Sequence, residues 1–385
     1  MLIKFFKLVL ILLFYQSPLY SKSKTLNDFN SHYLSNYFSG IVAYENSDNS
    51  QALKFFKSSK YLIKQHNSYL KNYIYALVHE GEVQQATREI KQNLTEENSD
   101  FFEAHLLLAL DHIKRKNYKK SREHLQRSYE FINNDRFSQI IAETLKQYLY
   151  VFEENKISNI KNKFGNFSFI NEVFQRCYLN DKNTKTYFNN LINSQNDSDY
   201  SRYIFFYLNY LIENGEHEEA KYISNNLDYL NSSLLISQGK KWIEDQRPEE
   251  FKKIFSCNNI TDVVGEFFFL VSNLYSSEDN FEKSNFYLNI SHYLNPKFKF
   301  NLSLLAENHY LNKDYIKSLK ILKSFNKKNE FYYWFRLKKE AQIISRKQDI
   351  GKSLDFINLN FKKIKNPSIK IIFDIANFNK NAKKY

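Results

Sequence analysis

The stretch Asp314-Tyr-Ile-Lys-Ser318 decides the fold, because its pattern recurs along the 385-residue chain. Asn or Asp, two variable residues and Lys-Ser also occur at Asn117–Ser121, Asn280–Ser284 and Asp349–Ser353. The last three of these serines are 34 and 35 residues apart, and Ala52 and Ala86 are also 34 apart. A fixed period of this size predicts an array of helical repeats.

Each repeat is predicted to be a hairpin of two helices, since apolar residues recur three and four positions apart on both sides of a polar turn. Gly40 and Ala52 have almost no side chain, so two helices can cross closely there. Gly81 suits a helix end because glycine adopts left-handed backbone angles without steric cost. The recurring Asn or Asp suits the N-cap of the second helix.

Small residues, glycines and one proline mark the repeats along most of the chain. They are Gly40, Ala52, Gly81, Ala86, Ala109, Ser121, Gly215, Ala220, Ser284, Pro296, Ala306, Ser318, Ala341 and Ser353. From residue 135 to 263 the pattern weakens, and hairpins around Ser158, Thr186 and Phe251 rest mainly on spacing. With only 7 Gly and 4 Pro, the composition also favours stacked helices over a sheet-rich fold.

A 34-residue hairpin with a small residue in each helix and an aromatic in the first resembles the tetratricopeptide repeat, although Ser often replaces Ala. The resemblance implies an all-α fold: a right-handed α-solenoid of about ten antiparallel hairpins. The layout, with a signal peptide and divergent middle repeats, looks like secreted tetratricopeptide proteins of alphaproteobacteria. Sel1-like or HEAT repeats have longer periods, and an irregular helical bundle is the remaining alternative.

The N-terminal residues are laid out as a secretory signal peptide. Lys4 and Lys7 precede an apolar run from Leu8 to Tyr15, and Ser21 and Ser23 suit cleavage. We therefore expect a signal peptide at 1–23, repeats at 24–134, divergent repeats at 135–263 and basic repeats at 264–385. The expected location is the periplasm, with an uncleaved N-terminal membrane anchor as the alternative.

Two cysteines, Cys177 and Cys257, are present and neither has a partner at metal-ligand spacing. One disulfide is compatible with export, but sequence cannot establish the pairing. The preferred interpretation is two separate buried thiols.

The net charge of +13 is concentrated at one end of the chain. Residues 290–385 carry 21 Lys plus Arg against 7 Asp plus Glu, whereas the remainder is close to neutral. A basic C-terminal quarter favours an acidic partner or an anionic surface, or it is a solvated lysine-rich face.

No constellation for catalysis or metal binding stands out. His105 and His112 lie seven residues apart, but no carboxylate completes a ligand set beside them. Gly351-Lys-Ser353 lacks the upstream glycine and strand of a phosphate-binding loop. We expect no enzyme activity, no cofactor and no metal.

The leading functional hypothesis is a periplasmic scaffold or adaptor that holds a protein partner in the concave groove of the array. The first helix of each pair lines such a groove, and the candidate contacts are Asn273, Glu307, Lys338 and Arg346. The alternative is attachment to anionic lipid or envelope polymer through the basic quarter. Nucleic acid is not expected, because export argues against it.

The repeat phase also concerns the last segment. After Ser353 the next small residue of a second helix is due just beyond Tyr385. Residues 371–378 form an apolar first helix, whereas terminal repeats normally have a polar outer face. We expect either that repeats are missing or that residues 371–378 dock on a partner.

Overall fold

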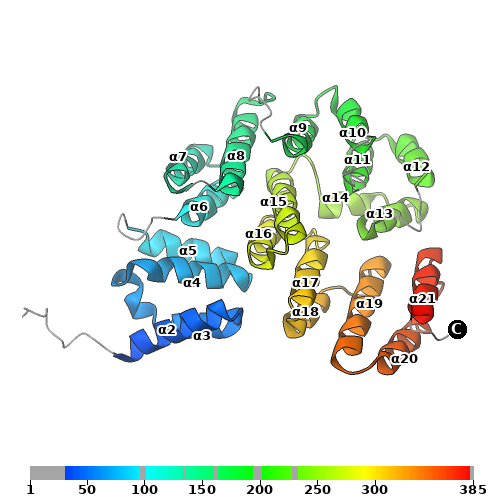
Figure 1. The fold of residues 1–385 in the computed structure, drawn as a ribbon. Helices are drawn as coiled ribbons and strands as arrows, with labels where there is room; N and C mark the ends of the chain where they lie inside the picture. The colour runs from blue at the N-terminus through cyan, green and yellow to red at the C-terminus, as the bar shows by residue number, and fades with distance from the viewer. Residues whose placement is uncertain are drawn as a thin grey trace, which may run out of the picture. The chain divides into compact units, whose positions relative to one another are not determined.

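The computed structural model describes residues 31–95, 101–132, 135–158, 164–193, 202–227 and 233–381, and all regular elements in these ranges are helices (Figure 1). They are α2 (Ser31–Glu45), α3 (Asn49–Ser58), η2 (Lys60–Lys64), α4 (Asn67–His79), α5 (Val83–Asn93), α6 (Phe102–Lys114), α7 (Tyr118–Ser128), η3 (Tyr129–Phe131), α8 (Arg136–Glu154), α9 (Asn166–Leu179), α10 (Thr184–Ile192), α11 (Arg202–Glu213), α12 (His217–Asn225), α13 (Leu234–Glu244), α14 (Glu249–Ile254), α15 (Ile260–Ser277), α16 (Phe281–Leu294), α17 (Asn301–Leu311), α18 (Tyr315–Leu322), α19 (Glu330–Lys347), α20 (Ile350–Phe361) and α21 (Ile369–Asn381). The all-α prediction is confirmed.

Contacts divide the chain into two compact units, Met1–Gln65 and His66–Tyr385. The described part of the first unit is the α2–α3 hairpin and η2. Gly40 lies directly against the Phe56 ring, and a Cβ at this position would be 2.8 Å from a ring carbon. Gly40 therefore makes room for the Phe56 ring of the second helix, and a close crossing at Ala52 stays a prediction.

Successive helices pair as antiparallel hairpins, and the described residues contain nine such pairs. Among the described helices, α8 and α21 have no hairpin partner of their own. The expectation of about ten hairpins was close, because the long α8 occupies the position of one hairpin and α21 that of a further first helix.

The turn between paired helices has the same backbone geometry in eight hairpins. At the α17–α18 turn, Lys313 has a φ of +62° and its N–H donates to the carbonyl of Tyr310. The N–H of Asp314 donates to the carbonyl of His309. This is a Schellman motif, which satisfies the last carbonyls of the first helix. The left-handed residues are Ser47, Gly81, Lys116, Asn180, Gly215, Gln246, Asp279 and Lys313.

The residue after each left-handed position often caps the next helix as well. The carboxylate of Asp314 accepts from the N–H of Lys317 at 3.1 Å. Asp48, Asn117 and Asn280 cap their helices in the same way, and Asp349 caps α20 although the residue before it is not left-handed. The N-cap prediction for the recurring Asn or Asp is confirmed. In each copy of the recurring string, the capped backbone N–H belongs to the Lys that precedes the Ser.

The serines of the recurring string join the two helices of a hairpin. The hydroxyl of Ser121 donates to the carbonyl of Ala109 at 2.9 Å, twelve residues earlier. Ser318 donates to Ala306 at 2.9 Å, and Ser353 donates to Ala341 at 2.7 Å. Serine in place of alanine therefore keeps the close crossing and adds a hydrogen bond. Ser284 differs, because its hydroxyl accepts from the side chain of Asn308.

The α15–α16 hairpin lies in the middle of the second unit and contacts helices that are far away in sequence (Figure 1). α15 packs against α6, α8 and α9, and α16 packs against α4 and α5. In a simple solenoid each repeat contacts only its neighbours. The central hairpin departs from this pattern, and the extended concave surface stays a prediction.

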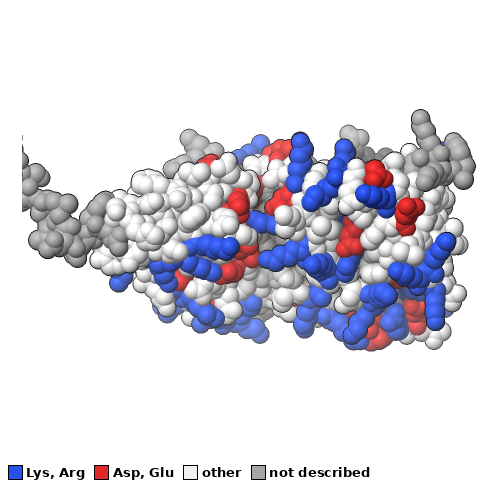
Figure 2. Space-filling view, turned by 90° about the horizontal axis from the view of Figure 1, so that it is seen from below, with Lys and Arg blue, Asp and Glu red and all other residues white. Residues whose placement is uncertain are grey.

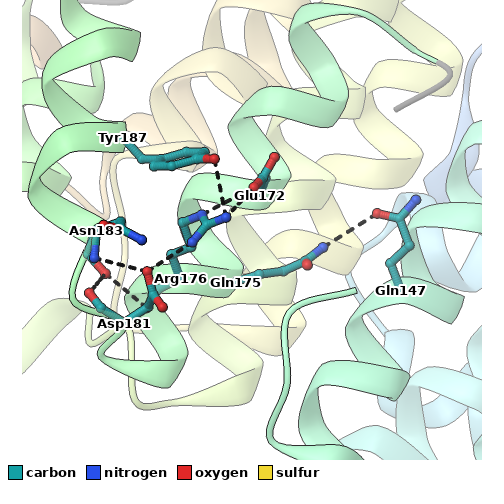
Figure 3. A network of polar contacts seen from close by, with 8 residues as sticks. Gln147, Glu172, Gln175, Arg176, Asp181, Asn183 and Tyr187 are labelled. Carbon is teal, nitrogen blue, oxygen red and sulfur yellow. Dashed lines mark hydrogen bonds and ion pairs between the residues drawn. The ribbon is translucent and has the colours of Figure 1, made fainter. Parts of the chain in front are cut away.

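Cys177 and Cys257 form a disulfide, with Cα atoms 5.5 Å apart, so the preferred interpretation of two separate thiols was wrong. The bond joins α9 to the segment between α14 and α15. Beside it, Arg176 donates to Glu172 at 2.7 Å, to Asp181 at 2.9 Å and to the Tyr187 hydroxyl at 3.2 Å (Figure 3). This network fixes the α9–α10 turn next to the cystine.

The predicted signal peptide at 1–23 lies outside the described residues. Among the described helices, none combines the length and apolar character needed to cross a membrane.

Candidate functional site

A polar cavity of about 640 Å³ lies where α16 packs against α5 and α6. Its lining residues come from segments about 200 positions apart in the sequence, so no local motif indicates it. The lining residues are Gly81, Glu82, Gln84, Gln85, Arg88, Asp111, Lys114, Arg115, Asn289, His292, Tyr293 and Pro296.

The charged groups of this cavity mostly hold the helices together. Lys114 donates to the backbone carbonyl of Tyr293 at 3.1 Å, and its Nζ lies 4.0 Å from the centre of the Tyr293 ring. Burial lowers the pKa of Lys114 and raises that of Tyr293. Asp111 forms ion pairs with Lys91 at 2.5 Å and with Arg115 at 3.0 Å, so its carboxylate is already compensated and is poorly suited to be a general base.

A second, smaller cavity of about 210 Å³ lies between the end of α4 and the α17–α18 hairpin. Lys317 reaches Glu80 at 3.0 Å across it. Burial lowers the pKa of His79 to about 3, with Lys317 as a second cause, so the imidazole is neutral at ordinary pH. These contacts join the beginning of the second unit to its C-terminal hairpins. Lys317, part of the string that decided the fold, therefore also makes a long-range contact.

A third cavity, of about 420 Å³, lies on successive first helices near the C-terminus, and we call it the C-terminal groove. α17, α19 and α21 all contribute to it, together with the start of α20. Its lining residues are Tyr310, Gln342, Ser345, Arg346, Ile350, Ser353, Phe378 and Asn381. The structure thus provides a hollow on the helices that sequence reasoning assigned to partner binding.

The C-terminal groove combines a cation, an acceptor and apolar side chains. Arg346 is exposed, and a hydrogen bond with the Tyr310 hydroxyl raises its pKa. The Oε1 atom of Gln342 is buried and has no hydrogen-bond partner among the described residues. A buried carbonyl oxygen in this state favours a ligand that donates a hydrogen bond. Ile350 and Phe378 supply apolar contacts.

The four candidate contact residues fall into two groups. Asn273 and Arg346 are exposed on α15 and α19, and Arg346 lies in the C-terminal groove. Glu307 pairs with the buried Lys339 at 2.5 Å, and Lys338 pairs with Asp374 at 2.6 Å. Glu307 and Lys338 therefore bind neighbouring first helices to each other. A contact with a partner stays a prediction for all four residues.

The histidines of α6 acquire a neighbour that sequence did not indicate. His124 of α7 lies between His105 and His112, with a ring nitrogen 3.5 Å from one of His105 and its ring stacked on that of His112. Burial, together with the two neighbouring histidine rings, lowers the pKa of His124 to about 4. In the described ranges, no group of three His, Cys, Asp or Glu side chains could hold a metal ion.

The hairpins, their Schellman turns and the serine crossings define an all-helical repeat fold of the tetratricopeptide-like type. Among solved structures, the crystal structure of yeast Tom70 is 13% identical and covers 92% of this chain and 85% of its own, with a TM-score of 0.26. The structure of Naa15/Naa10 bound to HypK-THB is 11% identical and covers 91% of this chain and 66% of its own, with a TM-score of 0.23. No protein-family model matches the chain, and no curated protein matches its sequence.

Proposed function

We propose that this chain is a non-enzymatic scaffold that binds a segment of a protein partner in the C-terminal groove. The observation that carries the proposal is that the unsatisfied Gln342 and the exposed Arg346 both line one hollow on three successive first helices. A protein segment supplies what the groove lacks, because it has backbone N–H donors, carboxylates and apolar side chains.

The groove favours a ligand that is acidic and partly apolar. Arg346 can hold a carboxylate with two parallel hydrogen bonds, and Ile350 and Phe378 can bury an apolar side chain nearby. The described residues that line the groove include no carboxylate to compete for Arg346. Glu307 of α17 lies outside the lining and is paired with Lys339.

We also propose export to the periplasm, as in secreted alphaproteobacterial tetratricopeptide proteins. The layout of residues 1–23 supports it, and the Cys177–Cys257 disulfide adds independent support, since disulfides persist in oxidising compartments. Fractionation of cells that express the tagged chain tests the location. Recovery with cytosolic markers, with both cysteines reactive to a thiol reagent, would contradict it.

Affinity purification with a matched pair of variants tests the groove. Arg346→Ala removes the cation that lines it, whereas Lys347→Ala removes the same charge from the next residue, which is exposed and outside the lining. We expect the wild type and Lys347→Ala to retain one stoichiometric protein at high salt, and Arg346→Ala to lose it. Equal loss in both variants would show that only net charge matters.

A second candidate function is attachment to an anionic surface, and exposed side chains on the second helices favour it. Ile316 of α18 is 76% exposed and Leu359 of α20 is 57% exposed. Exposed lysines lie three, four and seven positions from each of them along the chain, namely Lys313, Lys320, Lys323, Lys352, Lys362 and Lys363. Figure 2 shows Lys and Arg in excess over Asp and Glu on one face. Apolar side chains among lysines are typical of helices that lie on anionic lipid.

Sedimentation with vesicles separates the two functions. If the second function holds, the chain binds phosphatidylglycerol vesicles at low salt and dissociates from them as salt screens the charges. It does not bind neutral phosphatidylcholine vesicles. Ile316→Ser together with Leu359→Ser should then weaken binding, whereas Arg346→Ala should change it little. Absence of binding at low salt would exclude this function.

A further inference from the structure

The last described helix, α21, buries one face and leaves the opposite face bare. Ile371 and Ile375 pack into a core cluster with residues of α19 and α20. On the other side Ile369 is 69% exposed, Ile372 48% and Phe373 45%, and Ala376 is exposed as well. These four residues follow the spacing i, i+3, i+4 and i+7, so they form one continuous apolar stripe.

The repeat register shows what covers the same stripe on the preceding first helix. Three residues of α19 lie 35 positions before Ile369, Ile372 and Ala376. They are Trp334, Leu337 and Ala341, which are 2%, 3% and 0% exposed.

On α19 this stripe is covered by the second helix of its hairpin, α20, together with the buried face of α21. Ile357 of α20 lies in the same core cluster as Trp334 and Leu337. Ser353 of α20 crosses at Ala341 and donates to its carbonyl at 2.7 Å. One repeat earlier, Ser318 crosses at Ala306 in the same way. Ala376 therefore has the same place in its repeat as Ala306 and Ala341, where the serine of a second helix crosses. No described helix covers the face around Ala376.

The charges around the bare face select among occupants. Asp374 is the only acidic residue of α21, and it already accepts from Lys338 at 2.6 Å and from the Trp334 indole at 2.9 Å. Lys380 lies four residues after Ala376 on the bare face and is exposed. The segment before α21 adds the exposed Lys362, Lys363 and Lys365. A second copy of the chain would bring like charges together, whereas an acidic helix would be complementary.

We propose that the bare face of α21 binds an acidic amphipathic helix of another protein, which crosses α21 at Ala376 with a small residue. The occupant takes the position relative to α21 that α20 takes relative to α19. Its apolar stripe covers Ile369, Ile372 and Phe373, and acidic side chains beside the stripe meet the lysines. The inference rests on the proposed protein-binding function but uses a surface distinct from the C-terminal groove, because Ala376 does not line that groove.

The probe is a labelled peptide with the sequence of residues 349–361, stapled to keep it helical and carrying Lys352→Glu. A control peptide also carries Ser353→Leu, which is too bulky for a close crossing. With the full chain, we expect fluorescence anisotropy to show binding of the first peptide, and binding about tenfold weaker for the control. Ala376→Leu in the protein should weaken binding of the first peptide by a similar factor. The exposed Ala376 allows this change without loss of folding, which circular dichroism checks.

Four results would overturn the proposal. The first is absence of binding by either peptide, and the second is unchanged binding to Ala376→Leu. The third is tighter binding of phosphatidylglycerol vesicles by Ala376→Leu together with unchanged peptide binding, because leucine enlarges an apolar face for lipid but blocks a helix crossing. A wild-type dimer that Ala376→Leu converts to monomer would assign the face to a second copy instead. Arg346→Ala should leave peptide binding unchanged, so failure of the groove and failure of this face are distinguishable.

Discussion

The ion pair between Arg202 and Glu266 offers the sharpest test of how the second unit is held together. It joins α11 to the central helix α15, and the two side chains are 14% and 2% exposed. The guanidinium donates to the two carboxylate oxygens at 2.8 and 2.7 Å and to Asn301 of α17 at 3.1 Å. Its carbon atom also lies 3.7 Å from the centre of the Phe269 ring.

We predict that Arg202→Met lowers the free energy of unfolding by about 3–5 kcal/mol, because it leaves a buried carboxylate without a counter-charge. The double variant Arg202→Met with Glu266→Leu should regain most of this loss, since similar-sized apolar residues replace a buried pair at little cost. Urea unfolding at several pH values measures both effects.

The pH dependence of the single variant follows from the same pair. Burial raises the pKa of Glu266, and Arg202 opposes that rise. Without Arg202 the folded-state pKa of Glu266 is higher still. At pH values between that pKa and the ordinary glutamate pKa of ~4, the folded protein keeps a proton that the unfolded chain has released. The defect of Arg202→Met should therefore be small at low pH and grow as pH rises. A loss below about 1 kcal/mol at neutral pH, or a double variant as unstable as the single, would refute the reasoning.

Three further predictions concern the turns, a buried acid and the cystine. Lys313→Gly should stabilise the chain by about 1 kcal/mol in urea unfolding, because Lys313 has a φ of +62° and glycine adopts this conformation without steric cost. Burial raises the pKa of Asp262 to about 7, so the stability that its protonated form contributes is complete below the ordinary pKa and is lost as pH rises towards 7. Asp262→Asn should therefore remove a loss of folding stability of up to about 4 kcal/mol between pH 4 and 8. Replacing both Cys177 and Cys257 with serine opens a cross-link between residues 80 apart and should cost about 4 kcal/mol, whereas a cost near zero would indicate that the bond does not constrain the unfolded chain.

Local features were predictable from the sequence because a few neighbouring residues determine them. Asp314 caps a helix through the N–H three residues later, and Ser318 crosses twelve residues after Ala306. Both spacings recur along the chain, so one sequence shows them several times. The hydrogen bond from Ser318 was still missed, since a small residue at a crossing needs no polar partner.

Features that join distant segments were not predictable in the same way. The packing of α16 on α4 and α5 brings Asn289 to the carbonyl of His79, 210 positions away, and no period marks that pair. The Cys177–Cys257 bond likewise depends on where α9 and the segment before α15 meet. In the C-terminal groove, Arg346 was chosen as a partner contact from its helix alone, and that contact stays a prediction. Gln342 and Phe378 line the same groove only in the folded chain.

Site-specific photo-crosslinking tests the central claim, that the C-terminal groove binds a protein segment. A photoreactive amino acid at Ser345 lies in the groove, and the same amino acid at the exposed Leu359 of α20 lies outside it. The account predicts one protein adduct of defined mass from position 345, absent in the Arg346→Ala background, and no such adduct from position 359. Adducts from position 359 alone, or from position 345 irrespective of Arg346, would contradict it.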